Sequence, residues 1–178
     1  SPYQPDGIVD GKSLLELVTN PSPPCDFEYP FAGLQQMTHG IRYGELTVIS
    51  AGTGQGKSTL TRQLATHLLD QDERVGYIAL EESNRRTALG LMSVATGKAL
   101  HLGEHTKETL QEAYDYTLKD WNLFLYDHFG SADPDTIYSR IEYMALALET
   151  KTIFLDHLSI LISGLDGDER KMIDTTMT

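Results

Sequence analysis

A glycine-rich stretch, Ala51–Ser58, constrains what this chain can fold into more than any other feature. It follows an apolar run, Leu46–Ile49, which is typical of a buried strand, and it leads into a helical pattern that begins near Thr59. A strand, a glycine loop and a helix in this order fit the phosphate-binding pattern G-x-x-x-x-G-K-[ST]. Ala51 departs from the pattern by taking the place of the first glycine, which the loop tolerates if the φ of Ala51 is negative.

The residue types in this stretch match the chemistry of a phosphate site. Its three glycines allow positive φ and a close approach of the backbone to an anion, and the amides then form a nest beside a helix N-terminus. Lys57 is expected to reach the β- and γ-phosphates, and the Ser58 hydroxyl is expected to bind Mg²⁺. The residues predicted to hold the nucleotide are Ala51, Gly52, Thr53, Gly54, Gln55, Gly56, Lys57, Ser58 and Thr59.

Strand and helix patterns alternate along the rest of the chain. After the strand at 46–49, we expect strands over 74–80, 123–128 and 152–157, and helices over 57–70, 84–95, 106–121 and from 133 onward. This alternation predicts an α/β fold in which a parallel sheet carries helices on both faces. In such sheets, ligands bind beyond the carboxyl ends of the strands.

Acidic residues follow three of the predicted strands, so they are expected to meet beside the glycine loop. Asp156 ends an apolar strand, and its carboxylate is expected to hold Mg²⁺ opposite Ser58. Glu81 follows another strand and is a candidate general base, although its position alone fits a solvated acidic turn equally well. Because successive side chains of a strand point to opposite faces, its neighbour Glu82 is expected to point away from the position of Glu81. Asp127 at the third strand end receives no role, and neither do the histidines that follow Asp127 and Asp156.

Composition bounds the possibilities further. The chain has 178 residues and a net charge of −12, which argues against a broad nucleic-acid-binding surface and leaves room only for a local one. A single cysteine, Cys25, cannot form an internal disulfide, so we expect a reducing, cytoplasmic setting. No apolar run approaches the length of a transmembrane helix, so no membrane partner is expected.

The N-terminal part predicts a linker with one short helix. Leu14, Leu17 and Val18 lie at helical spacing within Gly11–Val18, and Asp10 or Ser13 could cap the helix start. A helix this short is marginal without a docking surface. The pattern leaves two options open, which are docking on its own domain and docking on a neighbouring subunit.

Several motifs in order resemble the helicase domain of ring-shaped replicative helicases. They are Gly40–Ile49, the glycine loop, Leu80–Ser83, Phe154–Ile160 and, most specifically, Asp168–Asp174. The chain is most similar to the primase-helicases of short-tailed phages and their mitochondrial relative twinkle, and less similar to bacterial DnaB helicases. The resemblance runs from about Gly33 to Thr178.

This resemblance implies a RecA-like P-loop NTPase that forms hexameric rings and moves 5′ to 3′ along single-stranded DNA, with Mg²⁺ as cofactor and ATP or dTTP as substrate. It implies that Lys57 and Glu81 are catalytic and that Asp156 binds the metal. It also implies a DNA-binding loop, a helix that docks on the next subunit, and a primase and a DNA polymerase as partners. The implied location is the cytoplasm of a phage-infected cell or the mitochondrial matrix. The residues of the implied DNA-binding loop are Ser163, Gly164, Arg170 and Lys171.

The family's domain continues beyond the motifs found here, with a further strand that senses the γ-phosphate, two more DNA loops and an arginine finger. The resemblance therefore implies a sheet cut short after the fourth strand. We expect a linker over 1–30, the amino-terminal part of the helicase domain over 31–178, and no unwinding by this segment alone. Two alternatives stay open: a RecA-fold ATPase of the recombinase or clock type, and a nucleotide-binding assembly module without turnover.

Overall fold

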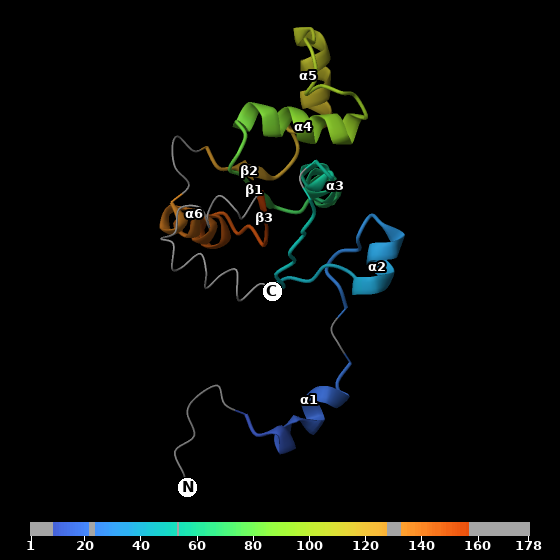
Figure 1. Cartoon of the computed structure of the whole chain (residues 1–178), viewed down its shortest axis with the longest axis vertical. Coiled ribbons are helices and arrows are strands. Elements are labelled where there is room, and N and C mark those ends of the chain that lie inside the picture. The colour runs from blue at the N-terminus through green and yellow to red at the C-terminus, as the bar shows by residue number, and fades with distance from the viewer. Residues whose placement is uncertain (1–8, 22–23, 53, 128–132, 157–178) are drawn as a thin grey trace.

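The centre of the fold is a parallel sheet of three strands (Figure 1). A computed structural model describes residues 9–21, 24–52, 54–127 and 133–156. Strand β1 (Val75–Ala79) lies between β2 (Leu123–Leu125) and β3 (Thr152–Asp156), and both neighbours run parallel to it. The three later strands and their parallel arrangement confirm the prediction.

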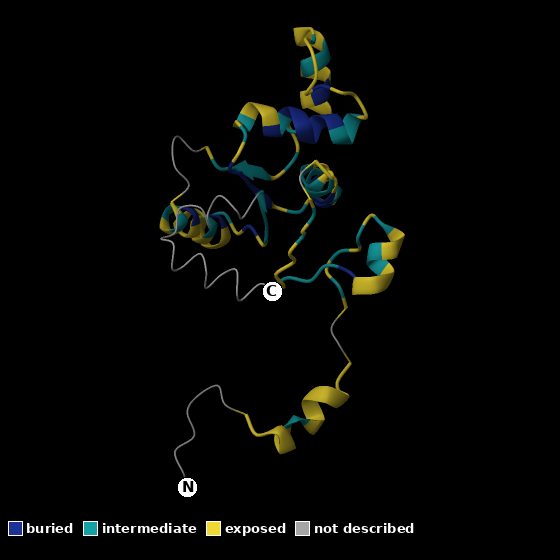
Figure 2. Ribbon diagram, viewed as in Figure 1, coloured by how far each residue is buried: buried dark blue, intermediate teal, exposed yellow. Residues whose placement is uncertain are grey.

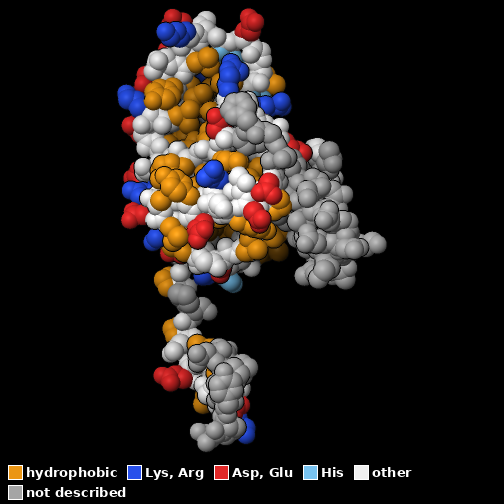
Figure 3. All heavy atoms as spheres, turned by 90° about the vertical axis from the view of Figure 1, so that its left-hand side faces the viewer, with side chains coloured by type: hydrophobic (Ala, Val, Ile, Leu, Met, Phe, Trp, Pro, Cys, Tyr) orange, Lys and Arg blue, Asp and Glu red, His pale blue; other side chains and the backbone are white. Residues whose placement is uncertain are grey.

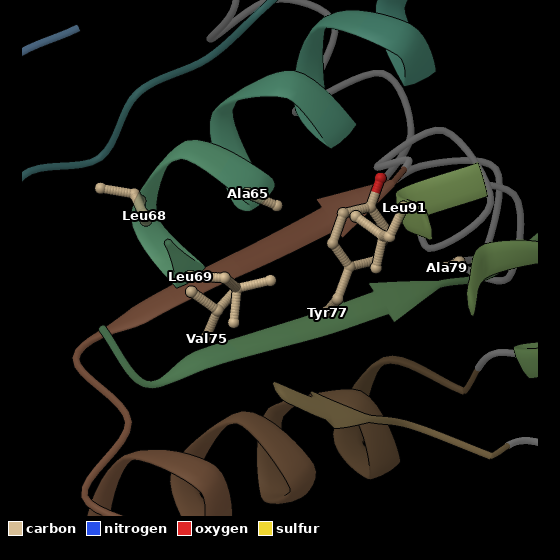
Figure 4. Close-up of a cluster of buried hydrophobic side chains, with 7 residues drawn as sticks. All are labelled: Ala65, Leu68, Leu69, Val75, Tyr77, Ala79 and Leu91. Carbon is tan, nitrogen blue, oxygen red and sulfur yellow. The ribbon is translucent and has the colours of Figure 1, made fainter. Parts of the chain in front are cut away.

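Helices cover both faces of the sheet, as predicted (Figure 1). Because side chains alternate along a strand, β1 contributes to two separate clusters. On one face it meets α3 (Lys57–Leu69) and α4 (Asn84–Thr96), and on the other face it meets α6 (Pro134–Ala147). The first cluster consists of Ala65, Leu68, Leu69, Val75, Tyr77, Ala79 and Leu91 (Figure 4). The second contains Ile78, Leu80, Ile137 and Met144.

Polar caps set where three of the helices begin. The side chain of Ser83 accepts from the Arg86 amide at the start of α4, and Thr106 caps α5 (Lys107–Tyr116) in the same way. Asp133 caps α6, whose first turn contains Pro134. Each cap satisfies an amide that a helix leaves without an internal partner. The helix predicted over 106–121 is confirmed as α5, but it ends five residues earlier than predicted, at Tyr116.

The predicted strand at Leu46–Ile49 is wrong in this structure. The segment has no strand assignment, and its backbone pairs with no strand in the described part of the chain. Leu46 is 90% exposed and Val48 is 60% exposed. A strand exists only through hydrogen bonds to a neighbour, and Leu46–Ile49 pairs with neither of the outer edges that β2 and β3 present in the described sheet. The described sheet thus has three strands rather than four.

The N-terminal region lies apart from the sheet (Figure 1). It forms a 3₁₀ turn, η1 (Gly11–Leu14), that continues into α1 (Leu15–Thr19), and Asp10 caps the start by accepting from the Lys12 amide at 3.2 Å. No residue of α1 is buried (Figure 2). A further short helix, α2 (Ala32–Thr38), precedes the glycine loop. Among the described helices, none is long and apolar enough to cross a membrane.

Candidate functional site

The glycine loop bends where its backbone adopts positive φ. Gly54 has a φ of 77° and Gly56 a φ of 86°, values that side-chain-bearing residues rarely adopt. Gly52 does not have a positive φ, so that part of the prediction is wrong; a Cβ there would lie 3.2 Å from the Gln55 side-chain nitrogen. Ala51 also lies outside the positive-φ region, which is the condition for tolerating alanine at this position. Thr53 lies outside the described residues.

Lys57 closes the loop on itself. It is the first residue of α3, and its Nζ donates to the backbone oxygen of Ala51 at 2.9 Å. Gly56 is the N-cap of α3, and it has no side chain that could accept a hydrogen bond from the first-turn amides of Lys57, Ser58 and Thr59. A helix N-terminus that combines such amides with a lysine ammonium favours an anion such as phosphate.

The predicted acidic positions follow adjacent strands at one edge of the sheet. Ala79 of β1 pairs with Asp156 of β3, and the Leu80 amide donates to the Asp156 backbone oxygen at 2.8 Å. Glu81 is the next residue. Asp127 lies two residues beyond the end of β2, the other neighbour of β1. The structure thus places Asp156 at the carboxyl end of β3, and Glu81 and Asp127 just beyond the carboxyl ends of β1 and β2, as predicted.

Two contacts bring the first half of α3 to the same edge of the sheet. Arg62 binds Glu82 through both carboxylate oxygens, at 2.7 and 2.8 Å, and the two side chains are only 14% and 15% exposed. The Thr61 hydroxyl lies 3.0 Å from the Tyr77 hydroxyl. The prediction that Glu82 points away from the general-base position agrees with this pairing. Sequence reasoning missed its partner Arg62, because one arginine among the many polar residues of α3 does not indicate a partner distant in the sequence.

Tyr77 has a strongly perturbed phenol. Burial is the largest of the effects that raise its pKa to about 12; the negative charges of Asp156 and Glu82 add to the rise, and the Arg62 charge opposes it. The phenol therefore lies within electrostatic reach of groups from α3, β3 and the segment after β1. These elements converge on one place, which is where the loop helix meets the strand ends.

The pKa of Tyr77 predicts a loss of stability at alkaline pH. Because the folded pKa lies above the unfolded value of about 10, the stabilisation is complete below pH 10 and is lost as pH rises towards 12. Ionisation of Tyr77 should lower the unfolding free energy of the wild type by up to about 2–3 kcal/mol as the pH rises from 10 to 12. Tyr77→Phe should lack this loss. Urea unfolding at pH 9 and pH 11.5 measures it, with Tyr138→Phe on the exposed face of α6 as the control. Equal alkaline losses in wild type and Tyr77→Phe would contradict the assignment.

Several predicted residues lie outside the described part of the chain. They are the four residues of the implied DNA-binding loop, Ser163, Gly164, Arg170 and Lys171. The structure therefore does not bear on their predicted roles.

The fold and this site define a P-loop nucleotide-binding domain. A parallel sheet, a glycine loop ending in Lys57 and Ser58, and carboxylates at the adjacent strand ends are the parts that such domains share. Residues 27–175 match the DnaB-like helicase C-terminal domain. The chain belongs to this family.

Similar proteins include a helicase/primase, a replicative helicase and a DNA repair protein. The whole chain is 35% identical to 34% of the DNA helicase/primase of Enterobacteria phage T3. A 79% portion is 28% identical to 30% of the replicative DNA helicase DnaB of Helicobacter pylori. A 65% portion is 30% identical to 25% of the DNA repair protein RadA of Halalkalibacterium halodurans. The chain thus spans about a third or less of the length of these relatives.

Proposed function

We propose that this chain is the NTP-binding and hydrolysing part of a ring-shaped replicative DNA helicase, which moves 5′ to 3′ on single-stranded DNA and unwinds duplex at a replication fork. One observation carries the proposal: Glu81 and Asp156 lie at the carboxyl ends of the paired strands β1 and β3, and α3, which begins at Lys57, is joined to the same region by the Arg62–Glu82 pair, in a chain of the DnaB-like family. The match to a phage helicase/primase over the whole chain supports the same conclusion.

The residues of the loop suit a nucleoside triphosphate such as ATP or dTTP. The amides of Ala51–Thr59 would surround the phosphates, and Lys57 would exchange its bond to the Ala51 oxygen for bonds to the β- and γ-phosphates. Ser58 and Asp156 offer a hydroxyl and a carboxylate, a ligand pair that suits Mg²⁺ because this ion keeps waters and phosphate oxygens as its other ligands. Bound Mg²⁺ would neutralise charge on the phosphates.

Within the described residues, no group of three or more histidine, cysteine, aspartate or glutamate side chains is placed to hold a metal. A site made of one serine, one aspartate and the nucleotide itself agrees with that finding. The metal-binding role of Asp156 therefore depends on a bound nucleotide.

Glu81 is the proposed general base. It follows the edge where β1 and β3 pair, and a carboxylate there would orient and deprotonate the water that attacks the γ-phosphate. Glu82 is unsuited to this role because Arg62 and Thr87 occupy its oxygens, at 2.7–2.8 Å and 3.0 Å.

Glu81→Gln in the whole protein should keep nucleotide affinity within about twofold and lower hydrolysis by at least about 100-fold, the usual range for a general base. Unwinding of a forked duplex should disappear together with hydrolysis. Equilibrium nucleotide binding, phosphate release and strand separation measure the three quantities. Glu108→Gln, on the first turn of α5, is the matched control and should leave all three unchanged. Normal turnover in Glu81→Gln would remove Glu81 from the mechanism.

Ring assembly is the proposed role of the N-terminal helix. Leu15, Leu17 and Val18 are exposed on α1, which buries no residue against the described body. A short helix with exposed apolar side chains needs a docking surface, and a neighbouring copy of this chain would provide one. We propose a homohexamer joined in this way, with residues 1–30 as the linker and 31–178 as the amino-terminal part of the helicase domain.

DNA contact would be local. On the face of Figure 3, acidic and basic side chains are interspersed among hydrophobic ones, and the net charge of the chain is −12. A broad basic surface is therefore absent from the part of that face that the structure describes. The proposed contacts are Ser163, Gly164, Arg170 and Lys171. Primase and DNA polymerase are the proposed partners, and the phage and bacterial relatives favour the cytoplasm of a bacterial cell over the mitochondrial matrix.

A second candidate follows from the similarity to RadA, which is a DNA repair protein. The same site would then drive a RecA-fold ATPase that is not a helicase. The RadA match covers 65% of the chain, whereas the phage helicase/primase match covers all of it, including the linker. We therefore prefer the helicase.

A further inference from the structure

Tyr77 joins the centre of the sheet to the loop helix by a single part-buried hydrogen bond. It is fully buried in the middle of β1, and its ring stacks on Phe154 of β3 with the centroids 5.7 Å apart. Its hydroxyl points away from β1 (Figure 4) and lies 3.0 Å from the Thr61 hydroxyl of α3. The two residues are 16 positions apart in the sequence.

The direction of this hydrogen bond follows from the partners of Thr61. The Thr61 hydroxyl has one proton, and it lies 3.1 Å from the Ser58 backbone oxygen and 3.3 Å from the Lys57 backbone oxygen, both of which can only accept. Thr61 therefore donates to the first turn of α3 and accepts from Tyr77. The result is a relay, meaning a chain of hydrogen bonds that runs from Tyr77 of the sheet through Thr61 to the backbone of Lys57 and Ser58, the residues proposed to hold the phosphates and Mg²⁺.

We infer that Tyr77 and Thr61 are a positioning pair that fixes the first turn of α3, and with it Lys57 and Ser58, relative to the strand ends that carry Glu81 and Asp156. The inference rests on the proposed nucleotide site and deepens it. The loop before α3 turns at two glycines with positive φ, so its own backbone constrains the helix start only weakly. The relay holds that turn from the opposite side.

Packing alone does not explain the two hydroxyls. A phenylalanine and a valine would fill the same space, and burying the Tyr77 hydroxyl carries a desolvation penalty that its hydrogen bond to Thr61 offsets. Thr66, on the same helix, shows what a purely local threonine does: it is buried, and its hydroxyl donates only to the Gln63 oxygen, at 3.1 Å. Thr61 differs in having a partner on the sheet.

The test uses Tyr77→Phe, Thr61→Val and the double variant in the whole protein. Each change deletes a hydroxyl and keeps the shape of the side chain. Affinity for mant-ATP, a fluorescent ATP analogue, is titrated with Mg²⁺ and with EDTA. Each single variant should weaken Mg²⁺-dependent binding by about fivefold, the usual effect of one hydrogen bond, and should change the Mg²⁺-free affinity by less than about twofold. The double variant should be no weaker than either single variant, because both remove the same link.

Thr66→Val and Tyr138→Phe are the matched controls, and neither should change either affinity. Unchanged Mg²⁺-dependent binding in Tyr77→Phe and Thr61→Val would overturn the inference. Additive losses in the double variant would also overturn it, and so would equal losses with Mg²⁺ and with EDTA, since these indicate general destabilisation.

Amide hydrogen exchange separates this inference from the proposed function. If wild type binds no mant-ATP, the proposed function fails, and exchange alone then decides the inference. Tyr77→Phe should speed exchange in the first turn of α3, where the Leu60 amide donates to the Gly56 oxygen at 2.9 Å, and leave the last turn of α3 unchanged. Unchanged exchange in the first turn, or faster exchange throughout α3, would count against a positioning pair.

Discussion

Lys57→Ala should weaken nucleotide binding by about 10- to 150-fold, the range expected for losing a hydrogen bond to a charged group. Lys57 is the only residue of α3 whose ammonium reaches back over the glycine loop, where it now binds the Ala51 oxygen at 2.9 Å. The fold should survive, because the packing of α3 depends on Leu64, Leu68 and Leu69 rather than on Lys57. Titration with mant-ATP in the presence of Mg²⁺ measures the affinity, and urea unfolding checks the fold.

The matched control for this change is Lys119→Ala. Lys119 also forms one short polar contact, an ion pair with Asp115 at 3.3 Å, but it lies on the surface beyond α5. Its removal should leave nucleotide affinity unchanged. Unaltered affinity in Lys57→Ala, or equal losses in both variants, would contradict the phosphate-loop assignment.

The ion pair between Arg62 and Glu82 should give the largest change in stability. Glu82→Leu leaves the largely buried Arg62 without its carboxylate, and should lower the unfolding free energy by about 3–5 kcal/mol. The Arg62 Nε atom is already buried without a hydrogen-bond partner, so nothing within the described structure replaces the lost bonds. Arg62→Met should have a smaller effect, because Glu82 keeps Thr87 at 3.0 Å and Arg86 at 3.5 Å. Urea unfolding at pH 7 measures each variant.

The double variant, Arg62→Met with Glu82→Leu, should be more stable than Glu82→Leu alone, because it removes both largely buried charges and replaces them with apolar volume. Glu149→Leu is the control. It breaks an exposed pair with Arg74, whose side chains are 47% and 79% exposed, and should cost less than about 1 kcal/mol. If Glu82→Leu matches wild type, or the double variant is less stable than Glu82→Leu, the pair does not hold α3 to the sheet.

The elements around the site could be predicted because their signals are local. The start of α3 follows from the glycine loop, and β1, β2 and β3 follow from continuous apolar runs that end in acidic residues. Parallel pairing then follows from the intervening helices. The sequence alone therefore predicts that Glu81 and Asp156 lie at the same edge of the sheet.

The parts that sequence reasoning missed depend on partners distant in the sequence. Leu46–Ile49 has the composition of a strand but no neighbouring strand in the described fold, and composition cannot report a missing neighbour. The Tyr77–Thr61 and Arg62–Glu82 pairs are separated by 16 and 20 residues, and no periodicity marks them. Both pairs tie the loop helix to the sheet, so they became visible only once helix and sheet were placed together.

NTP hydrolysis by the whole protein, with and without single-stranded DNA, tests the central claim most directly when combined with the mass of the protein in solution. A helicase ring should be an oligomer of about six copies whose turnover rises severalfold when single-stranded DNA is added, and Lys57→Ala should abolish that turnover. A monomer, or turnover that is the same with and without DNA, would contradict the helicase and leave a RecA-fold ATPase of another kind.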